Sequence, residues 1–276
     1  MTATALDGAT ALSTLTDQAR AGRYGPDPAD QHIALAFATS QAVRHTGRAR
    51  GYRNEVLSLR LGAAVGSCAV EPGELPADAL TDCVGASVAA LLDHPLTAVR
   101  VAALDAYLMH CRPHTRAAGA RPVTLPAGGS LAKSRARARA VTGLLPAAGV
   151  RRALVVGVVN SLLEQLRSRG IDYLPCDLKG GTTEWGEPVR TDALAHLDDC
   201  DAVLASGMTL GNGTLDPLLA HARDTGKPLV LFAQTGSAVL PRLLGEGATA
   251  VSAEPYPFFW LDGGPTVLHL YGGDTR

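Results

Sequence analysis

The residues best suited to chemistry lie in one polar, glycine-containing stretch, 206–214, with the sequence Ser-Gly-Met-Thr-Leu-Gly-Asn-Gly-Thr. This stretch follows a short apolar run, 202–205, and precedes apolar residues at helical spacing, Leu215, Leu218 and Leu219. The pattern predicts a strand, a loop and a helix start. Free backbone N–H groups in such a loop, together with the positive end of the helix dipole, favour an anion such as a carboxylate or a phosphate.

The same stretch is also consistent with a well-capped turn that binds nothing. Thr209, Asn212 and Thr214 are common loop and N-cap residues, and Gly211 and Gly213 can supply backbone with positive φ. The residue types alone leave both interpretations open.

The elements that position this stretch alternate between strand and helix from Arg152 onward. Strands are expected at 153–159, 171–175, 202–205, 228–232, 249–253 and 266–271, and helices at 162–169, 192–197, 215–224 and 238–244. Strands joined by helices of this length require a mostly parallel sheet with right-handed crossovers. We therefore predict a doubly wound, Rossmann-like α/β domain for residues 151–276.

A set of polar residues follows the ends of these predicted strands, where open α/β sheets bind their ligands. The expected ligand-binding residues are Asn160, Asp177, Ser206, Gly207, Thr209, Asn212, Gly213, Thr214, Thr235 and Ser237. They are neutral hydrogen-bonding groups around one carboxylate, which suits a small polar, amino-acid-like molecule or a metal chelate. A metal site here would be hard and rich in oxygen, with Asp177 as a ligand and Cys176 or His196 as a softer addition.

The first part of the chain, residues 1–115, is expected to form a smaller α+β domain. Its expected elements are a helix at 31–43, a hairpin of strands 56–61 and 64–70 that turns at Gly62, and helices at 77–92 and 95–109. The proline- and glycine-containing stretch 116–150 is interpreted as a linker with a connecting helix. The two domains are expected to meet at a cleft.

Composition excludes several classes of partner. The chain has 276 residues, a formal net charge of −1 and 4% aromatic residues, and no basic run with interleaved aromatics, so nucleic acid is not an expected partner. No basic segment precedes an apolar core at the N-terminus, and no apolar run approaches the roughly 20 residues that span a bilayer. We expect a cytoplasmic protein without a membrane partner, and the excess of arginine over lysine with abundant alanine is typical of a bacterial, GC-rich genome.

Cysteine and glycine spacing exclude further sites. The five cysteines are widely spaced and include no C-x-x-C pair, so neither a disulfide framework nor a structural zinc site is expected. The first strand of the second half is followed by Gly157 alone, where the dinucleotide fingerprint G-x-G-x-x-G has three glycines. We therefore expect no NAD or flavin.

Several stretches resemble a known family of bacterial and archaeal proteins, the "putative heavy-metal chelation" family. They are 200–219, which contains Ser-Gly-Met-Thr-Leu-Gly-Asn-Gly-Thr, then 227–237 and 245–253. In this family a Rossmann-like domain follows a smaller domain similar in fold to the N-terminal domain of enolase, and residues 30–111 fit that smaller domain. The resemblance implies a divalent metal ion as a cofactor, and the likeness to enolase implies no enolase chemistry.

Two functions stay open at this point. The resemblance implies a protein that binds or processes a small polar or anionic metabolite or a metal chelate in the cleft between the domains. The alternative is a metabolic enzyme, a lyase or another non-redox catalyst, that acts on an amino-acid-like molecule, with a role in specialised metabolism. No G-x-S-x-G, H-E-x-x-H or P-loop motif is present to name a reaction. The partner is then a small molecule or a metal chelate, and a homodimer is compatible with the sequence.

Overall fold

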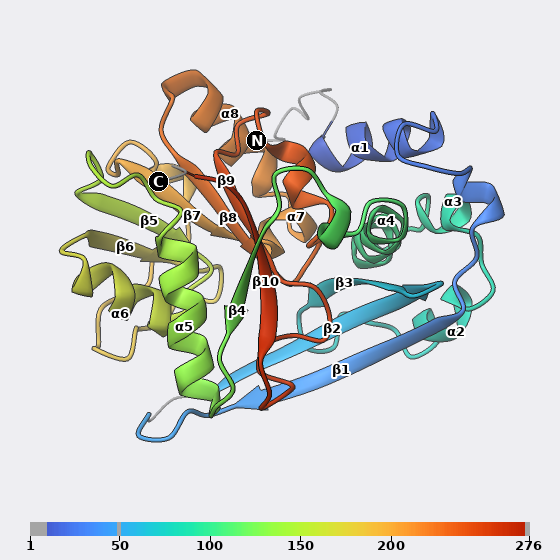
Figure 1. Ribbon diagram of the computed structural model, residues 1–276. Helices are drawn as coiled ribbons and strands as arrows, with labels where there is room; N and C mark the ends of the chain where they lie inside the picture. The colour runs from blue at the N-terminus through green and yellow to red at the C-terminus, as the bar shows by residue number, and fades with distance from the viewer. Residues whose placement is uncertain (1–9, 49–50, 274–276) are drawn as a thin grey trace, which may run out of the picture.

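The chain folds around two separate β-sheets. The structure is a computed structural model that describes residues 10–48 and 51–273. One sheet has three strands in the order β1-β2-β3, and the other has seven strands in the order β4-β10-β9-β8-β7-β5-β6 (Figure 1). No single sheet runs through both halves of the described chain. The predicted α/β class, with a small α+β part ahead of a larger sheet, is confirmed.

The small sheet is an antiparallel meander. Its strands are β1 (Leu35–Val43), β2 (Tyr52–Leu61) and β3 (Ala64–Val70). The predicted hairpin is confirmed, because Leu61 pairs with Ala64 across a turn in which Gly62 has a φ of 57°. The predicted helix at 31–43 is wrong: from residue 37 to residue 43 covered and exposed side chains alternate along β1, which is the period of a strand with one covered face.

Short helices and one long helix complete this half of the chain. They are α1 (Ala11–Arg20), η1 (Pro28–Asp30), α2 (Ala79–Cys83), α3 (Val88–Leu91), α4 (Thr97–Cys111) and η2 (His114–Arg116). The alanine-rich α4 packs closely on β3. A Cβ atom at Gly66 of β3 would lie 1.9 Å from the backbone nitrogen of Ala106, so this contact between helix and strand requires glycine.

The large sheet is mostly parallel. Its parallel strands are β5 (Arg152–Val156), β6 (Asp172–Cys176), β7 (Ala202–Ser206), β8 (Leu229–Ala233) and β9 (Ala250–Ala253). The last strand, β10 (Thr266–Gly272), is antiparallel to β9 and to β4 (Arg121–Leu125). The parallel strands follow the doubly wound order 6-5-7-8-9, and the antiparallel strands extend that sheet at one edge.

The stretch expected to be a linker contributes to the large sheet. β4 forms an edge strand there, and α5 (Ser130–Thr142) packs beside α6 (Asn160–Ser168) on one face of the sheet. The linker interpretation of 116–150 is therefore corrected, because these residues belong to the second half. Pro122 hides the strand in the sequence, since proline is confined to sheet edges and β4 is an edge strand.

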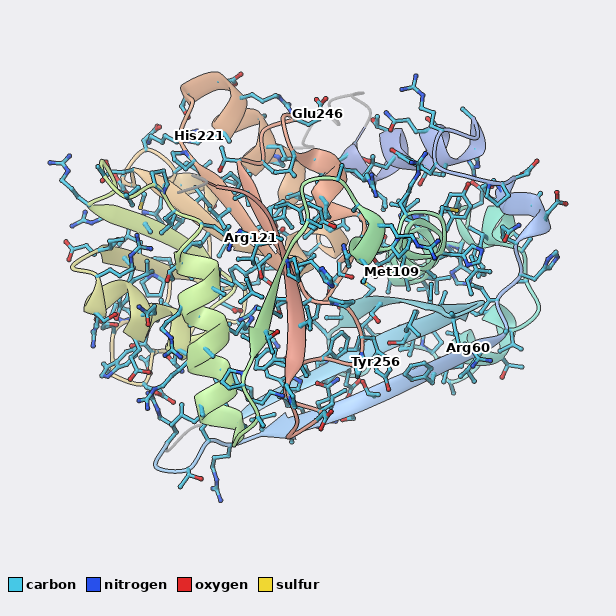
Figure 2. The ribbon with its side chains drawn as sticks, viewed as in Figure 1. Arg60, Met109, Arg121, His221, Glu246 and Tyr256 are labelled. Carbon is cyan, nitrogen blue, oxygen red and sulfur yellow. The ribbon has the colours of Figure 1, made fainter. Side chains whose placement is uncertain are left out.

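The other face of the large sheet carries elements from both halves of the chain. The remaining helices there and in the loops are η3 (Leu194–His196), α7 (Met208–Gly211), α8 (Leu215–Thr225) and η4 (Leu240–Leu243). Leu57 of β2, Leu104 of α4 and Leu231 of β8 lie in one hydrophobic core. Side chains thus fill the space between the two sheets (Figure 2). Within the described residues, no helix combines the length and apolar character needed to cross a bilayer.

Candidate functional site

The chain order of the large sheet creates a crevice between β5 and β7. Both strands are parallel neighbours, but α6 follows β5 on one face and α8 follows β7 on the other. Because the chain leaves the two strands toward opposite faces, a crevice opens at their carboxyl ends. The strand ends meet closely there: Gly157 has a φ of 88°, and a Cβ atom on it would lie 2.6 Å from the Cβ of Ser206.

Two adjoining cavities lie at this crevice. The first, which we call the acidic pocket, has a volume of about 210 Å³, and its lining includes the carboxylates of Glu71, Asp177 and Asp192. The second, which we call the arginine pocket, has a volume of about 310 Å³. Its basic lining residues are His45, Arg53, Arg137 and Lys179. Both linings include Glu71, Gly157, Asp177, Ser206 and Met208. None of the described residues that line the acidic pocket is basic.

Asp177 is held at the junction of the two pockets by backbone groups. Its Oδ2 accepts a hydrogen bond from the Val158 N–H at 3.2 Å, and its Oδ1 accepts one from the Lys179 N–H at 3.0 Å. Each carboxylate oxygen has two lone pairs, so both can accept another donor or bind a cation. Lys179 pairs with Glu71 at 2.7 Å, which brings β3 of the small sheet to the same junction.

The polar loop after β7 contributes one wall of the acidic pocket. Ser206, Thr209, Asn212 and Thr214 all line that pocket. Thr209 is buried, and its hydroxyl donates to the Ser206 carbonyl at 2.7 Å. Asn212 Oδ1 accepts from the Thr214 N–H at 3.1 Å and from the Thr214 hydroxyl at 2.7 Å. Part of the expected loop is helical as α7, and Gly213, with a φ of 79°, lies in neither pocket lining.

Gly207 and Thr235 line the arginine pocket. A Cβ atom on Gly207 would lie 2.6 Å from the Thr235 carbonyl oxygen, so the loops after β7 and β8 meet closely. The Thr235 hydroxyl accepts from the Ala69 N–H of β3 at 2.9 Å. Ser237 is buried outside both linings, two residues farther along the same loop.

Asn160 lies beside the site but does not line it. Its backbone N–H and its Nδ2 donate to the hydroxyl of Tyr52 at 3.1 and 2.6 Å, and its Oδ1 accepts from the Glu184 N–H at 3.3 Å. Asn160 is absent from both linings, whereas Tyr52 lines the arginine pocket. The expected site consists of the ten ligand-binding residues and Cys176. Eight of these residues line the two pockets, and Asn160, Gly213 and Ser237 do not.

Comparison with known proteins finds a family model that matches part of the chain. A family model described as "Putative heavy-metal chelation" (DUF364) matches residues 140–252. The fold is similar to that of a DUF364 protein of unknown function from Desulfitobacterium hafniense, with a TM-score of 0.60 and 16% identity over 94% of this chain and 98% of that one. The family model covers less than half of this chain, and the structural likeness at 16% identity shows a shared fold.

A second DUF364 structure has the same fold. This protein of unknown function from Pyrococcus horikoshii matches with a TM-score of 0.56 and 17% identity over 88% of this chain and 86% of that one. No curated protein matches the sequence. The likeness extends over both halves of this chain, so the small sheet and the large sheet belong to one shared fold.

The donor atoms of residues 10–48 and 51–273 do not form a complete centre for a bare metal ion. Among the residues described, no three His, Cys, Asp or Glu side chains come together as a ligand set. Burial, and then the carboxylates of Asp177 and Asp192, raise the pKa of the Cys176 thiol to about 11, so the thiol is protonated at neutral pH in the metal-free protein. His196 pairs with Asp199 at 3.0 Å and lines neither pocket.

Sequence reasoning missed the contribution of the small sheet and of α5. Glu71 and Tyr52 reach the pockets from β3 and β2, and Arg137 reaches the arginine pocket from α5. Met208, at the start of α7, lines both pockets but reads as an ordinary apolar residue. Arg137 had no signal in the sequence either, because only the structure shows that it is buried whereas Arg135 and Arg139 on the same helix are exposed.

Proposed function

We propose that this protein, like the family that its second half resembles, binds a small ligand with an anionic part, either a polar metabolite or a metal chelate, across the acidic and arginine pockets. The observation that supports the proposal is the continuity of two cavities around Gly157 and Ser206, at the switch point of a doubly wound sheet, one lined by carboxylates alone among its charged groups and the other adding basic side chains. One extended ligand can then place a cationic centre near Asp177 and an anionic group on the far side of the junction.

A chelated metal suits these pockets better than a bare ion. The acidic pocket offers the oxygen atoms of Asp177, Asp192 and Glu71 in its lining, but they do not converge as a ligand set among the described residues. A small organic chelator brings most of the donor atoms itself, so the protein needs to add only one or two oxygens and to hold the chelator by its polar groups. The implied metal would therefore be part of the ligand.

The experiment begins with protein purified without chelators. Native mass spectrometry detects a retained small molecule, and elemental analysis detects its metal. The same protein is then titrated with zinc as the free ion and as the citrate complex. We expect a retained molecule or tighter binding of the complex than of the free ion. A protein that retains nothing and binds neither form contradicts the proposal, and a retained organic molecule without metal favours a metabolite. Light scattering after gel filtration tests the homodimer that the sequence allows.

A further inference from the structure

Arg137 is a buried cation at the edge of the arginine pocket. Its side chain, which is only 6% exposed, extends from α5, and its Nε donates to Glu254 Oε1 at 2.7 Å. The guanidinium lies over the rings of Phe232 at 4.9 Å and Phe259 at 5.6 Å. The carboxylate and the two rings fix the plane of the guanidinium, so its orientation is set before any ligand binds.

The outer edge of this guanidinium is still free to donate. Within the described residues, neither Nη atom of Arg137 makes a hydrogen bond. Neither Nη atom is among the fully buried polar atoms that lack a partner, so both keep some accessible surface. Arg137 lines the arginine pocket, so these donors face the cavity. Gln234, in the same lining, has a buried Nε2 that also lacks a partner among the described residues. Two side chains that fold into this cavity therefore keep unused donors.

We propose that the two Nη atoms of Arg137 anchor a carboxylate group of the ligand, with Gln234 Nε2 as a further donor. This inference rests on the proposed function and names the chemistry of one end of its ligand. The two N–H groups on the outer edge of a guanidinium match the two oxygens of a carboxylate in a bidentate pair. The assigned ligand class is a carboxylic acid that also carries a cationic centre or a chelated metal.

Charge favours a carboxylate over a phosphate dianion in this position. Arg137 is already paired with Glu254, so the pair as a whole is close to neutral. Two other basic lining residues are also engaged, because Lys179 pairs with Glu71 and Arg53 pairs with Glu55. A single negative charge therefore suits the pocket, whereas a second desolvated charge has no free cation to balance it.

The test compares glycine, which carries one carboxylate and one cationic centre, with inorganic phosphate as probes. Each is titrated calorimetrically, without metal, into the wild-type chain and into Arg137→Gln, Arg137→Lys and Arg139→Gln. Arg139 lies on the same helix and is exposed, so Arg139→Gln removes the same charge outside the pocket. Arg137→Lys keeps a cation beside Glu254 but loses the planar fork. Melting temperatures show which variants are folded.

We expect the wild-type chain and Arg139→Gln to bind glycine alike and more tightly than phosphate. Arg137→Gln should weaken glycine binding about tenfold or more, the loss of one charge-assisted pair, and folded Arg137→Lys should lose several-fold. The inference is overturned if folded Arg137→Lys binds glycine as the wild type does, if phosphate is preferred, or if the wild type does not bind glycine. A retained ligand seen by native mass spectrometry would still support the proposed function in those cases.

Discussion

The hydroxyl of Tyr52 lies 2.6 Å from Asn160 Nδ2 and 3.1 Å from the Asn160 backbone nitrogen. Tyr52 is the first residue of β2 in the small sheet, and Asn160 is the first residue of α6 in the large one. The small sheet therefore supplies the acceptor for a helix N-terminus of the other half of the chain. This contact holds in place the turn of residues 157–159, which lines the crevice between β5 and β7.

Tyr52→Phe should lower both stability and ligand affinity. The substitution keeps the ring but leaves the Asn160 N–H and Nδ2 without their acceptor, which typically costs about 1–3 kcal/mol of unfolding free energy. Urea denaturation measures the stability, and titration with zinc citrate measures the affinity.

Tyr256→Phe is the matched control. Tyr256, labelled in Figure 2, packs edge-on against Phe37 of β1 at 5.3 Å, it lines neither pocket, and no hydrogen bond of its hydroxyl occurs within the described residues. Equal losses in the two variants would show that the Tyr52 hydroxyl has no special role.

Asp177→Asn should reduce binding of a metal chelate more than Cys176→Ser does. Asp177 keeps lone pairs at the junction of the two pockets, whereas the pKa of about 11 keeps the Cys176 thiol protonated. We expect at least a tenfold loss for Asp177→Asn and less than a threefold change for Cys176→Ser, consistent with one charge-assisted interaction. Zinc retained after desalting in the presence of citrate, measured by elemental analysis, gives the comparison. The reverse order would show that the thiol is a ligand.

Stability should depend on pH through Asp105. This carboxylate in α4 accepts from the Ser67 N–H at 2.8 Å and the Ala238 N–H at 2.6 Å, and burial raises its pKa to about 7. The unfolded group has a pKa of about 3.9, so between pH 4 and 7 the folded state holds a proton that the unfolded state has lost. The contribution of Asp105 to stability is therefore complete below pH 4 and falls as pH rises to 7, by at most about 1.4 kcal/mol per pH unit.

Urea titrations at several pH values test this linkage. The difference in unfolding free energy between the wild type and Asp105→Asn should shrink as pH rises from 4 to 7 and stay constant above 7. Asp82→Asn, at an exposed position in α2, should show no such change. A difference that is independent of pH across this window would mean that Asp105 is already ionised in the folded protein at pH 4.

Asn212→Ala should weaken ligand binding about tenfold, the equivalent of one hydrogen bond to a charged group. Asn212 is exposed and lines the acidic pocket, although its Oδ1 also closes a local turn with Thr214. Asn212→Asp keeps that acceptor and should melt as the wild type does. If Asn212→Ala instead lowers the melting temperature by many degrees while folded molecules bind as before, the side chain serves the turn alone.

The parallel strands and the hairpin could be predicted because local pattern decides them. Apolar runs such as 202–205 are too short for a helix and are bounded by polar loops, and Gly62 marks a tight turn between two strands. β1 was misread because its covered face consists mainly of polar or small residues, including Thr39 and Gln41, which weaken the period of two. β4 was missed because Pro122 argues against a strand unless the edge position is known.

The candidate site was predictable only where one chain segment builds it. Ser206, Thr209 and Asn212 follow a strand end in the sequence, and the fold rule for open sheets places such residues at the crevice. Tyr52 and Arg137 come from elements whose contact with that crevice depends on tertiary packing, which no local pattern encodes. Asn160 and Ser237 also follow strand ends, but their side chains are turned into protein contacts instead of the pockets.

The central claim, that ligand binds where the two pockets join, is tested most directly by filling the junction. Met208 lines both pockets and a third cavity beside them, so the larger side chain of Met208→Trp should occupy the space. Met208→Leu conserves volume and should be tolerated. Titration with zinc citrate should give the same dissociation constant for the wild type and Met208→Leu, and one at least about tenfold higher for folded Met208→Trp, a difference of about 1.4 kcal/mol. A folded Met208→Trp variant that binds as tightly as the wild type would contradict the account.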